Sequence, residues 1–159
     1  MDIRIDNEKE GKFKYRVCGI LENNHKYLVV KIQHNDFYCL PGGHVELDED
    51  TDHAVLREMS EELGYEVKIK KLIAVNQNFF KTQTGKPFHE LGFYYIVEAK
   101  NPKDVNPNNY SREEIDKGEK KHLEFRWVTE EEMKTIAFRP LFIAENLHRE
   151  TPLINITRD

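Results

Sequence analysis

The chain has 159 residues, which is close to the ~100–200 residues of a single domain. Its charged fraction is 33% and its net charge is −5, a balance that argues against a basic nucleic-acid surface or a polybasic membrane surface. Leu, Ile, Val and Phe still account for 43 of the 159 residues, about 27%, above the ~20% below which chains tend to be disordered. The composition therefore predicts one folded domain over residues 1–159, with neither nucleic acid nor a membrane as its partner.

The cysteines and the apolar segments of the sequence indicate the cellular compartment of the protein. Cys18 and Cys39 form no C-x-x-C pair and no zinc-ligand spacing. The first ten residues hold no apolar segment typical of a signal peptide, and no apolar run approaches the ~18 residues of a membrane-spanning helix. We therefore expect a cytoplasmic protein.

The start of the chain predicts a β-hairpin followed by a short strand. Residues 13–21 and 27–32 are rich in β-branched and aromatic side chains, and a turn-prone polar stretch separates them. Residues 37–40 form a third apolar piece, which Pro41-Gly42-Gly43 ends. We expect a sharp turn with exposed backbone groups at these glycines, because glycine lacks a Cβ.

Residues 50–63 carry the clearest helical pattern in the chain. Asp50 is placed as the N-cap, and Gly64 follows directly after the last apolar position. The apolar positions recur at spacings of three and four and are Val55, Leu56, Met59 and Leu63. We predict a helix that packs on a sheet through Leu56, Met59 and Leu63.

A second antiparallel strand pair is predicted over residues 67–75 and 91–97. Residues 101–121 follow, with two prolines, several asparagines and many charges, a composition typical of a long, mobile surface loop that could act as a lid.

The C-terminal part predicts one more strand and two helices. Residues 123–128 give a strand around the single tryptophan, Trp127. The segment from Thr129 to Glu132 resembles a capping box that opens a short helix. A final helix is expected from about residue 141 to residue 150.

Charged residues recur at fixed spacings after the double glycine. Gly43 is followed by Glu49, then by Arg57-Glu58, Glu61-Glu62 and Gly64. On a helix at ~100° per residue, the carboxylates of Glu58, Glu61 and Glu62 are related as i, i+3 and i+4 and share one face. Because like charges this close repel, a hard divalent cation such as Mg²⁺ or Mn²⁺ is their natural partner. The pattern indicates metal-assisted hydrolysis of a phosphoanhydride, in which the ion activates a water molecule.

An acidic helix face is more often ordinary solvated surface, and this reading fits Glu61-Glu62 taken alone. The extended pattern is harder to explain in that way. Seven fixed identities, each at a background of ~7%, coincide by chance at only ~10⁻⁸ per starting position. We therefore interpret the set as a functional motif.

The motif resembles the box of the Nudix hydrolase superfamily, G-x5-E-x7-R-E-U-x-E-E-x-G-U, in which U is bulky and aliphatic. Met59 fits the first U, whereas Tyr65 departs from the last, which we interpret as a local change in packing. The resemblance implies an α/β fold, namely a Nudix-type α/β/α sandwich around a mixed β-sheet.

The resemblance also implies roles for individual residues. Glu61, Glu62 and the backbone carbonyl of Gly42 would bind the metal ion. Glu58 would be a further ligand or the general base. Arg57 would orient a carboxylate, and Glu49 would support the loop or reach the metal through water.

Members of the superfamily commonly recruit another carboxylate from outside the box. The candidates in this chain are Glu90, Glu113, Glu114, Glu119 and Glu124. We prefer Glu124, which precedes Trp127 on the last predicted strand.

The implied function is Mg²⁺- or Mn²⁺-dependent hydrolysis of the pyrophosphate bond in a nucleoside diphosphate linked to another moiety, by attack of activated water on phosphorus. Its partner would be this small molecule, and a homodimer is compatible with the sequence. The subfamily markers of ADP-ribose enzymes (a proline) and of dinucleoside polyphosphate enzymes (a tyrosine) lie a short distance beyond the box. Residues 79–83 occupy that stretch and carry neither marker, so the substrate stays open.

Two other classes of function remain as alternatives. A non-catalytic Nudix domain that senses a nucleotide would be expected to have lost box carboxylates, which this chain keeps. An α/β protein-interaction domain with an acidic helix would show no stabilisation by divalent cations.

Overall fold

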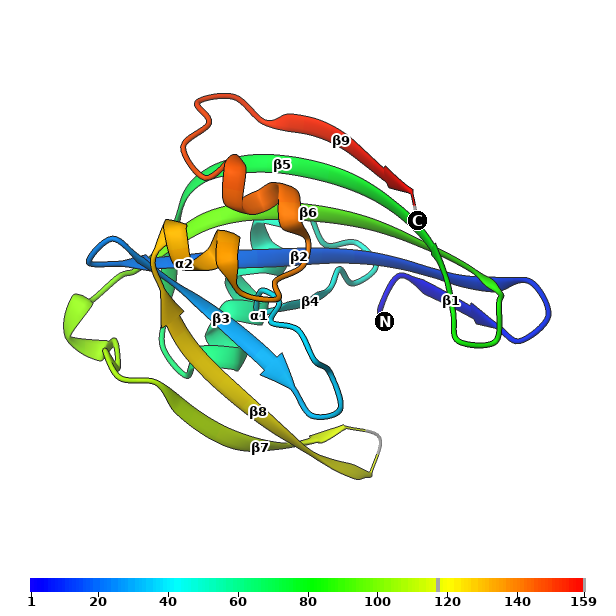
Figure 1. Cartoon of the computed structure of the whole chain (residues 1–159), viewed down its shortest axis with the longest axis horizontal. Helices are drawn as coiled ribbons and strands as arrows, with labels where there is room; N and C mark the ends of the chain where they lie inside the picture. The colour runs from blue at the N-terminus through cyan, green and yellow to red at the C-terminus, as the bar shows by residue number, and fades with distance from the viewer. Residues whose placement is uncertain (117, 159) are drawn as a thin grey trace.

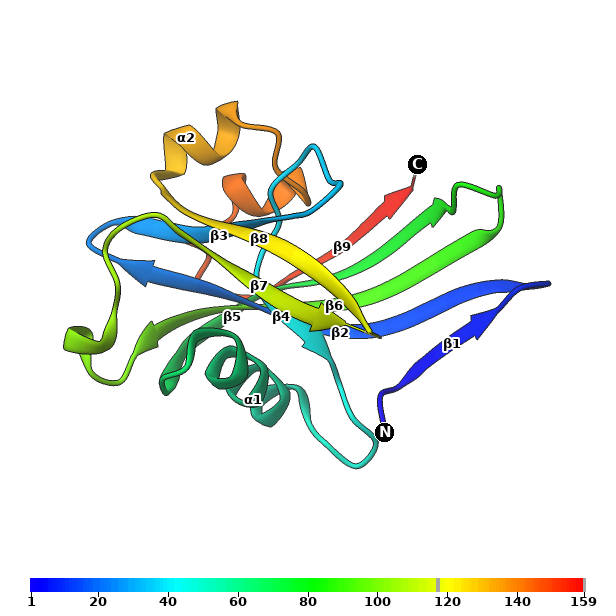
Figure 2. The same cartoon turned by 90° about the horizontal axis from the view of Figure 1, so that it is seen from below.

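The protein is built from a curved, mixed β-sheet with helices on both of its faces (Figures 1 and 2). The computed structural model describes residues 1–116 and 118–158. The strands in this part of the chain are β1 (Arg4–Asn7), β2 (Gly11–Asn23), β3 (Lys26–Ile32), β4 (Gly42–His44), β5 (Val67–Lys81), β6 (Pro87–Ala99), β7 (Tyr110–Asp116), β8 (Glu119–Val128) and β9 (Leu153–Arg158). The helices are α1 (Thr51–Leu63), α2 (Glu130–Thr135) and the 3₁₀ segments η1 (Pro102–Asp104) and η2 (Leu141–Glu145).

The strand order is β7-β8-β3-β2-β6-β5-β9, and β1 and β4 pair with β2 outside this path. The pairs β2–β6 and β5–β9 are parallel, and the other ladders are antiparallel. Figure 2 shows α1 below the sheet and α2 with η2 above it. The predicted α/β/α sandwich around a mixed sheet is thus confirmed. None of the described helices has the length and apolar composition needed to cross a bilayer.

The predicted hairpin of β2 and β3 is confirmed, but its ladder is short. The two strands pair only at Glu22–Tyr27 and Asn23–Lys26. Beyond the turn they separate, because β3 continues along β8 whereas β2 pairs with β4 through its residues Arg16–Cys18. This separation places the double glycine of β4 beside the middle of the sheet.

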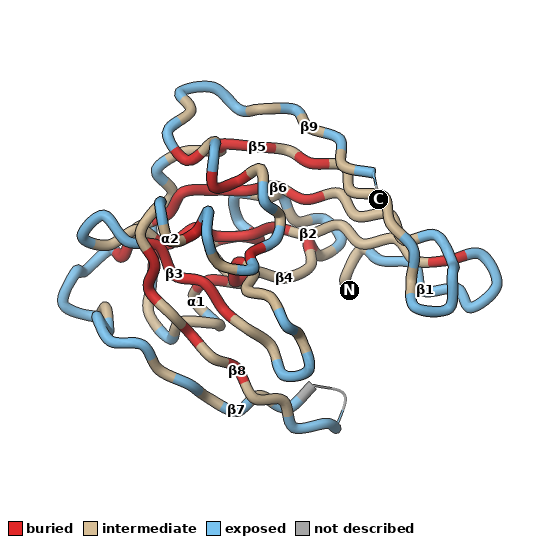
Figure 3. The backbone as a smooth tube through the Cα atoms, viewed as in Figure 1, coloured by how far each residue is buried: buried red, intermediate tan, exposed pale blue. Residues whose placement is uncertain are grey.

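Two apolar clusters, one on each face of the sheet, form the core, and the buried segments of Figure 3 follow the middles of the central strands. Successive residues of β2 enter different clusters, because successive side chains of a strand point to opposite faces of the sheet. Ile20 packs with Met133 and Ile143 below α2 and η2, whereas Leu21 packs with Met59 against α1. Both helical layers are therefore fixed to the same strands.

Helix α1 begins and ends as predicted, and its most deeply buried face also includes Ala54 and Val55. The Asp50 side chain accepts from the His53 amide, and Gly64 adopts the left-handed conformation at φ 81° that ends the helix. The residues buried against the sheet are Ala54, Val55 and Met59, whereas Leu56 and Leu63 are only half-buried at the margin. Met59 is fully buried against the sheet as predicted, and Leu56 and Leu63 pack against the same apolar cluster while remaining partly exposed.

A glycine on the neighbouring strand allows Met59 to pack this deeply. A Cβ at position 19 would overlap the Met59 thioether, so Gly19 leaves the space in which Met59 packs on β2. Because Val55 and Met59 are one turn apart on the same face of α1, packing of Met59 at this point also buries Val55.

The surface loop predicted over residues 101–121 is wrong in its second half. The structure has η1 at Pro102–Asp104, then β7, and β8 already begins at Glu119; Lys117 lies outside the described residues. Charged side chains suit an edge strand, where they oppose pairing with other chains, so the polar composition of β7 does not exclude a strand.

The connection before β7 is also anchored to the sheet. The Trp127 indole donates to the Asn106 carbonyl at 2.9 Å, and the Trp127 amide donates to the Asn109 side chain at 2.9 Å. The strand predicted around Trp127 and the capping box at Thr129 are both present.

The final helix predicted over residues 141–150 is reduced to the short η2 segment. The Asn146 side chain donates to the Phe142 carbonyl at 2.6 Å, which is a local alternative to helix continuation. The chain then forms β9, which runs parallel to β5 and which the sequence did not predict. The strand predicted over 37–40 is also wrong, since that piece makes only isolated bridges at Tyr38 and Cys39.

Candidate active site

The two glycines of β4 are required by the space around them. A Cβ at Gly43 would overlap the Glu58 carboxylate, and a Cβ at Gly42 would overlap the Val17 carbonyl of β2. Neither glycine has a positive φ and both lie in a strand, so the sharp turn predicted at them is wrong and their role is close approach. This contact brings the backbone of β4 against the carboxylate side of α1.

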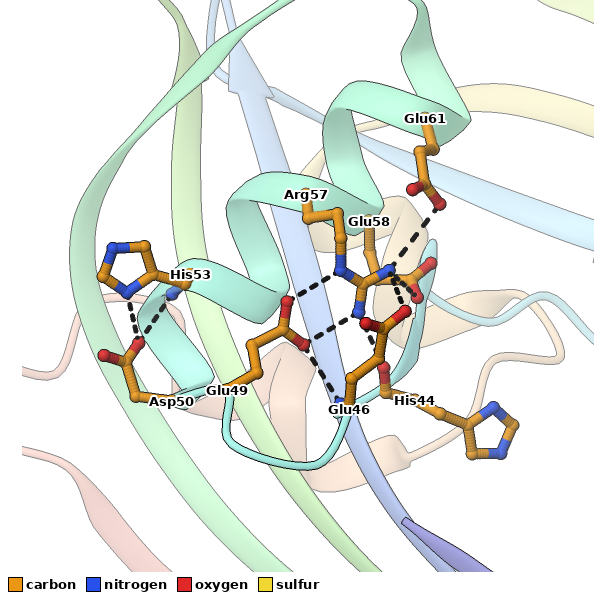
Figure 4. Close-up of polar contacts among 8 residues, drawn as sticks. All are labelled: His44, Glu46, Glu49, Asp50, His53, Arg57, Glu58 and Glu61. Carbon is orange, nitrogen blue, oxygen red and sulfur yellow. Dashed lines mark hydrogen bonds and ion pairs between the residues drawn. The ribbon is translucent and has the colours of Figure 1, made fainter. Parts of the chain in front are cut away.

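Arg57 organises the loop that joins β4 to α1 (Figure 4). Its Nε donates to Glu49 Oε2 at 2.7 Å, and its Nη2 donates to Glu49 Oε1 at 2.9 Å and to the His44 carbonyl at 3.0 Å. Its Nη1 donates to Glu58 Oε1 at 2.9 Å. The guanidinium therefore fixes the loop and the Glu58 carboxylate together.

Glu49 acts on the same loop. It accepts from the Glu46 amide at 3.0 Å in addition to the two bonds from Arg57. The hydrogen bond from Arg57 lowers the pKa of the Glu49 carboxyl. These contacts match the loop-supporting role that the sequence resemblance implies for Glu49.

Glu58 and Glu62 are the two box carboxylates that the structure turns toward the sheet. Because Val55 and Met59 dock, the residues beside them on the helix face inward, and the side chains of Glu58 and Glu62 are only 19% and 17% exposed. Burial raises the pKa of Glu62 to about 7, and burial also raises the pKa of Glu58, although Arg57 opposes that rise. Both carboxylates are thus in surroundings that favour an added positive charge.

Glu61 is placed differently from its two neighbours. Its side chain is 64% exposed, and it lies 3.7 Å from Arg57 Nη1, on the outer side of the guanidinium. Among the described residues, no three His, Cys, Asp or Glu side chains converge into a metal-binding group. The structure therefore brings Glu58 and Glu62 together but leaves Glu61 on the solvent side.

The donor chemistry of this region nevertheless fits a hard divalent cation. Two half-buried carboxylates one helical turn apart supply oxygen ligands, and the glycine at 43 leaves room for a carboxylate against the backbone of β4.

The preferred extra carboxylate, Glu124, is on the wrong face of the sheet. It pairs across the ladder with Ser111 and lies 3.3 Å from Lys31, whereas its neighbours Leu123 and Phe125 point to the α1 side. Residues directly opposite in an antiparallel ladder share a face, so Glu124 points away from Glu62.

Strand β7 supplies Arg112, which sequence reasoning missed, and Glu114, which was one of the five candidate carboxylates. Arg112 is opposite Leu123 in the ladder, so it faces α1, and its Nη2 lies 3.4 Å from Glu62 Oε2. Glu114 is two residues further on the same face, and its charge contributes to the raised pKa of Glu62. One pattern in the sequence could have indicated this strand: Tyr110, Arg112 and Glu114 recur at a spacing of two, the period of one face of a strand.

The other candidate carboxylates have partners of their own or are exposed. Glu90 lies 3.8 Å from Arg16 on β2, and Glu113 lies 2.7 Å from His122 Nδ1. Glu119 is exposed at the start of β8. Of the five candidates, Glu114 therefore has the position that best suits a role beside Glu62.

Comparison with known proteins defines the family of this chain. The NUDIX domain model matches residues 12–147, and the chain belongs to this family. It is 44% identical over 86 residues to the ADP-ribose pyrophosphatase of Methanocaldococcus jannaschii, a match that covers 52% of this chain and 49% of that protein. The matches to the curated relatives span 49% and 38% of their lengths, about half or less.

Solved structures show the same fold. The mutator MutT protein from Bacillus halodurans has a TM-score of 0.61 at 16% identity, with 91% of this chain and 89% of that chain covered. The MutT NUDIX hydrolase from Burkholderia pseudomallei has a TM-score of 0.59 at 20% identity, with 87% and 98% covered. At these identities the likeness concerns the fold alone.

Proposed function

We propose that the protein is a Nudix pyrophosphohydrolase that hydrolyses the phosphoanhydride bond of a nucleoside diphosphate linked to another moiety. The observation that carries this proposal is the pair of half-buried carboxylates, Glu58 and Glu62, which lie one turn apart on α1. Glu58 lies against Gly43, where any side chain would overlap its carboxylate. An ordinary solvated acidic face would expose both side chains.

The residues that would hold a divalent cation are Glu58, Glu61 and Glu62, with the carbonyl of Gly42. A bound Mg²⁺ or Mn²⁺ would supply neutralisation of the diphosphate charge and activation of water. Glu61 already lies near the shared guanidinium of Arg57, at 3.7 Å. Its exposed side chain has the freedom to change rotamer, which the inward-facing pair lacks.

Arg57 is the positioning residue of the proposed site. Its bidentate contact with Glu49 fixes the plane of the guanidinium, and Nη1 then holds Glu58 Oε1 at 2.9 Å. The second oxygen of Glu58 stays available to bind an ion or to accept a proton. Whether Glu58 is a ligand or the general base is the question that the kinetics of its variants answer.

The substrate class is inferred from the relatives. The M. jannaschii protein that matches at 44% identity is an ADP-ribose pyrophosphatase, so ADP-ribose is the first substrate to test. The proline marker of ADP-ribose enzymes is missing at residues 79–83, so other nucleoside diphosphate derivatives belong in the same screen.

The test is a screen for release of monophosphate or phosphate from ADP-ribose, nucleotide sugars, dinucleoside polyphosphates and nucleoside triphosphates, with and without Mg²⁺. We expect turnover only with the ion. Glu62→Gln should abolish nearly all of it, because the amide keeps the shape but loses the charge. Glu66→Gln is the matched control, since Glu66 lies just beyond α1 and is 74% exposed. Equal turnover of Glu62→Gln and the wild type at saturating Mg²⁺ would refute the metal assignment.

We also propose a cytoplasmic location for the protein, which its two free thiols support. Cys18 and Cys39 are both unpaired, as a reducing compartment would keep them.

A further inference from the structure

Among the described residues, Arg57 and Arg112 make direct ion pairs with Glu58 and Glu62 of α1, and their guanidinium groups are held in different ways. Arg57 makes four hydrogen bonds of 2.7–3.0 Å to Glu49, His44 and Glu58. Arg112 reaches Glu62 from β7 with an Nη2–Oε2 distance of 3.4 Å, longer than the usual ~2.7–3.2 Å of an N–H···O bond. Arg112 is therefore the more loosely held of the two.

The remainder of the Arg112 side chain is also weakly fixed. Its Nε is buried and has no hydrogen-bond partner among the described residues. Its Cζ lies 5.5 Å from the centre of the Phe125 ring, a contact that permits sliding and tilting of the guanidinium. The side chain is 34% exposed, so a change of rotamer needs no rearrangement of the core.

Glu62 cannot bind both the Arg112 guanidinium and a divalent cation strongly at the same time. Its Oε2 is the atom nearest to Arg112, and a divalent ion bound to the same carboxylate would repel the guanidinium at this short range. Because Glu62 is only 17% exposed, water compensates its charge poorly when no cation is close.

We propose that Arg112 is an exchangeable counter-ion of Glu62 that competes with the divalent cation for this carboxylate. The inference rests on the metal site of the proposed function and adds a residue that regulates its affinity. It gives Glu62 a positive partner whether or not the ion is bound. It also makes strand β7, which lies outside the Nudix box, a determinant of metal affinity.

The test is the dissociation constant of Mg²⁺ and of Mn²⁺, measured by isothermal titration calorimetry on the full chain without substrate. Arg112→Gln removes the competitor and its repulsion, so both ions should bind roughly two- to fivefold more tightly, the range of part-exposed ion pairs. Arg126→Gln is the matched control. Arg126 is 35% exposed and lies 3.3 Å from Glu132, but it sits on the opposite face of the sheet. Its variant should bind both ions as the wild type does.

A second measurement follows the wild-type protein itself and needs only the conservative variant Arg112→Lys, to assign the signal. The NMR signal of the Arg112 Nε–H group, identified by its loss in Arg112→Lys, should shift when Mg²⁺ is added, while that of Arg126 stays in place. The proposal is overturned if Arg112→Gln binds the ions no more tightly than the wild type, or if the Arg112 signal does not move at saturating Mg²⁺. Failure of the metal site itself looks different, because the wild type and Glu62→Gln would then bind Mg²⁺ equally.

Discussion

The Met59 thioether rests on Gly19 so closely that any side chain at position 19 would overlap it. This contact sets the rotation of α1 and therefore the inward direction of Glu58 and Glu62. Gly19→Ala should lower the free energy of unfolding by about 1–3 kcal/mol, as over-packing does, and should also lower kcat/KM by shifting the helix. Chemical denaturation and steady-state kinetics measure the two effects.

The double variant Gly19→Ala/Met59→Ala provides the control for this prediction. The added methyl group then enters the space that the thioether leaves, so the double variant should lose less stability than the sum of the single variants. Strict additivity would show that the contact does not set the position of the helix.

Arg57→Lys tests whether the forked guanidinium matters beyond its charge. Lysine keeps the positive charge but cannot bind both oxygens of Glu49 and reach Glu58 at the same time. We expect kcat to fall roughly 10- to 100-fold, the range seen when a residue that orients a ligand is lost. The free energy of unfolding should fall by about 1–2 kcal/mol. A variant with wild-type kcat would contradict the positioning role.

A hydrogen bond between Glu130 and His148 connects the start of α2 to the segment after η2. His148 Nε2 lies 2.7 Å from Glu130 Oε2, and this hydrogen bond lowers the pKa of the Glu130 carboxyl below its ordinary 4.5. A lowered pKa in the folded state means that the contribution to stability is present above pH 4.5. It is lost as the pH falls through the folded-state pKa.

Glu130→Gln should accordingly cost ~0.2–1 kcal/mol of stability near pH 6, with the difference vanishing at strongly acidic pH. Urea unfolding at a series of pH values measures this dependence. Glu131→Gln, at the exposed neighbouring position, is the control and should show a smaller cost. Equal costs for both variants near pH 6 would show that the contacts of Glu130 with His148 and Lys134 contribute nothing specific.

The two thiols should react slowly in the folded protein. Burial raises the pKa of Cys18 to about 12 and that of Cys39 to about 11, so little thiolate is present near neutral pH. Ellman's reagent at pH 8 should therefore modify the native protein far more slowly than the unfolded chain, with Cys39 ahead of the more buried Cys18. Rapid modification of both thiols in the native state would contradict this expectation.

Local signals in the sequence were sufficient for the parts of the site that lie on one element. The N-cap at Asp50, the stop at Gly64 and the spacing of the carboxylates all depend on residues within one helix, and α1 is found where they place it. The rotation of that helix depends instead on Gly19, which lies on a strand far away in the sequence. Periodicity alone did not show that Ala54 and Val55 are buried more deeply than Leu56 and Leu63.

The strand structure of β7 and the role of Arg112 were missed for a related reason. Its charges were interpreted as a sign of a solvated loop, whereas pairing with β8 gives the segment its structure. Arg112 and Glu62 are 50 positions apart in the chain, so only the sheet brings them together. The choice of Glu124 failed because a strand alternates between two faces, and the sequence did not show which face carries the site.

The anchoring of the segment before β7 to Trp127 gives the protein a built-in optical reporter. Trp127 is the only tryptophan of the chain, and its indole N–H and its amide both bond to that segment, at Asn106 and Asn109. The emission maximum and the fluorescence lifetime of Trp127 should therefore change when the segment detaches and water reaches the ring. Stopped-flow fluorescence could then follow the opening of this edge of the sheet in real time, without any attached dye.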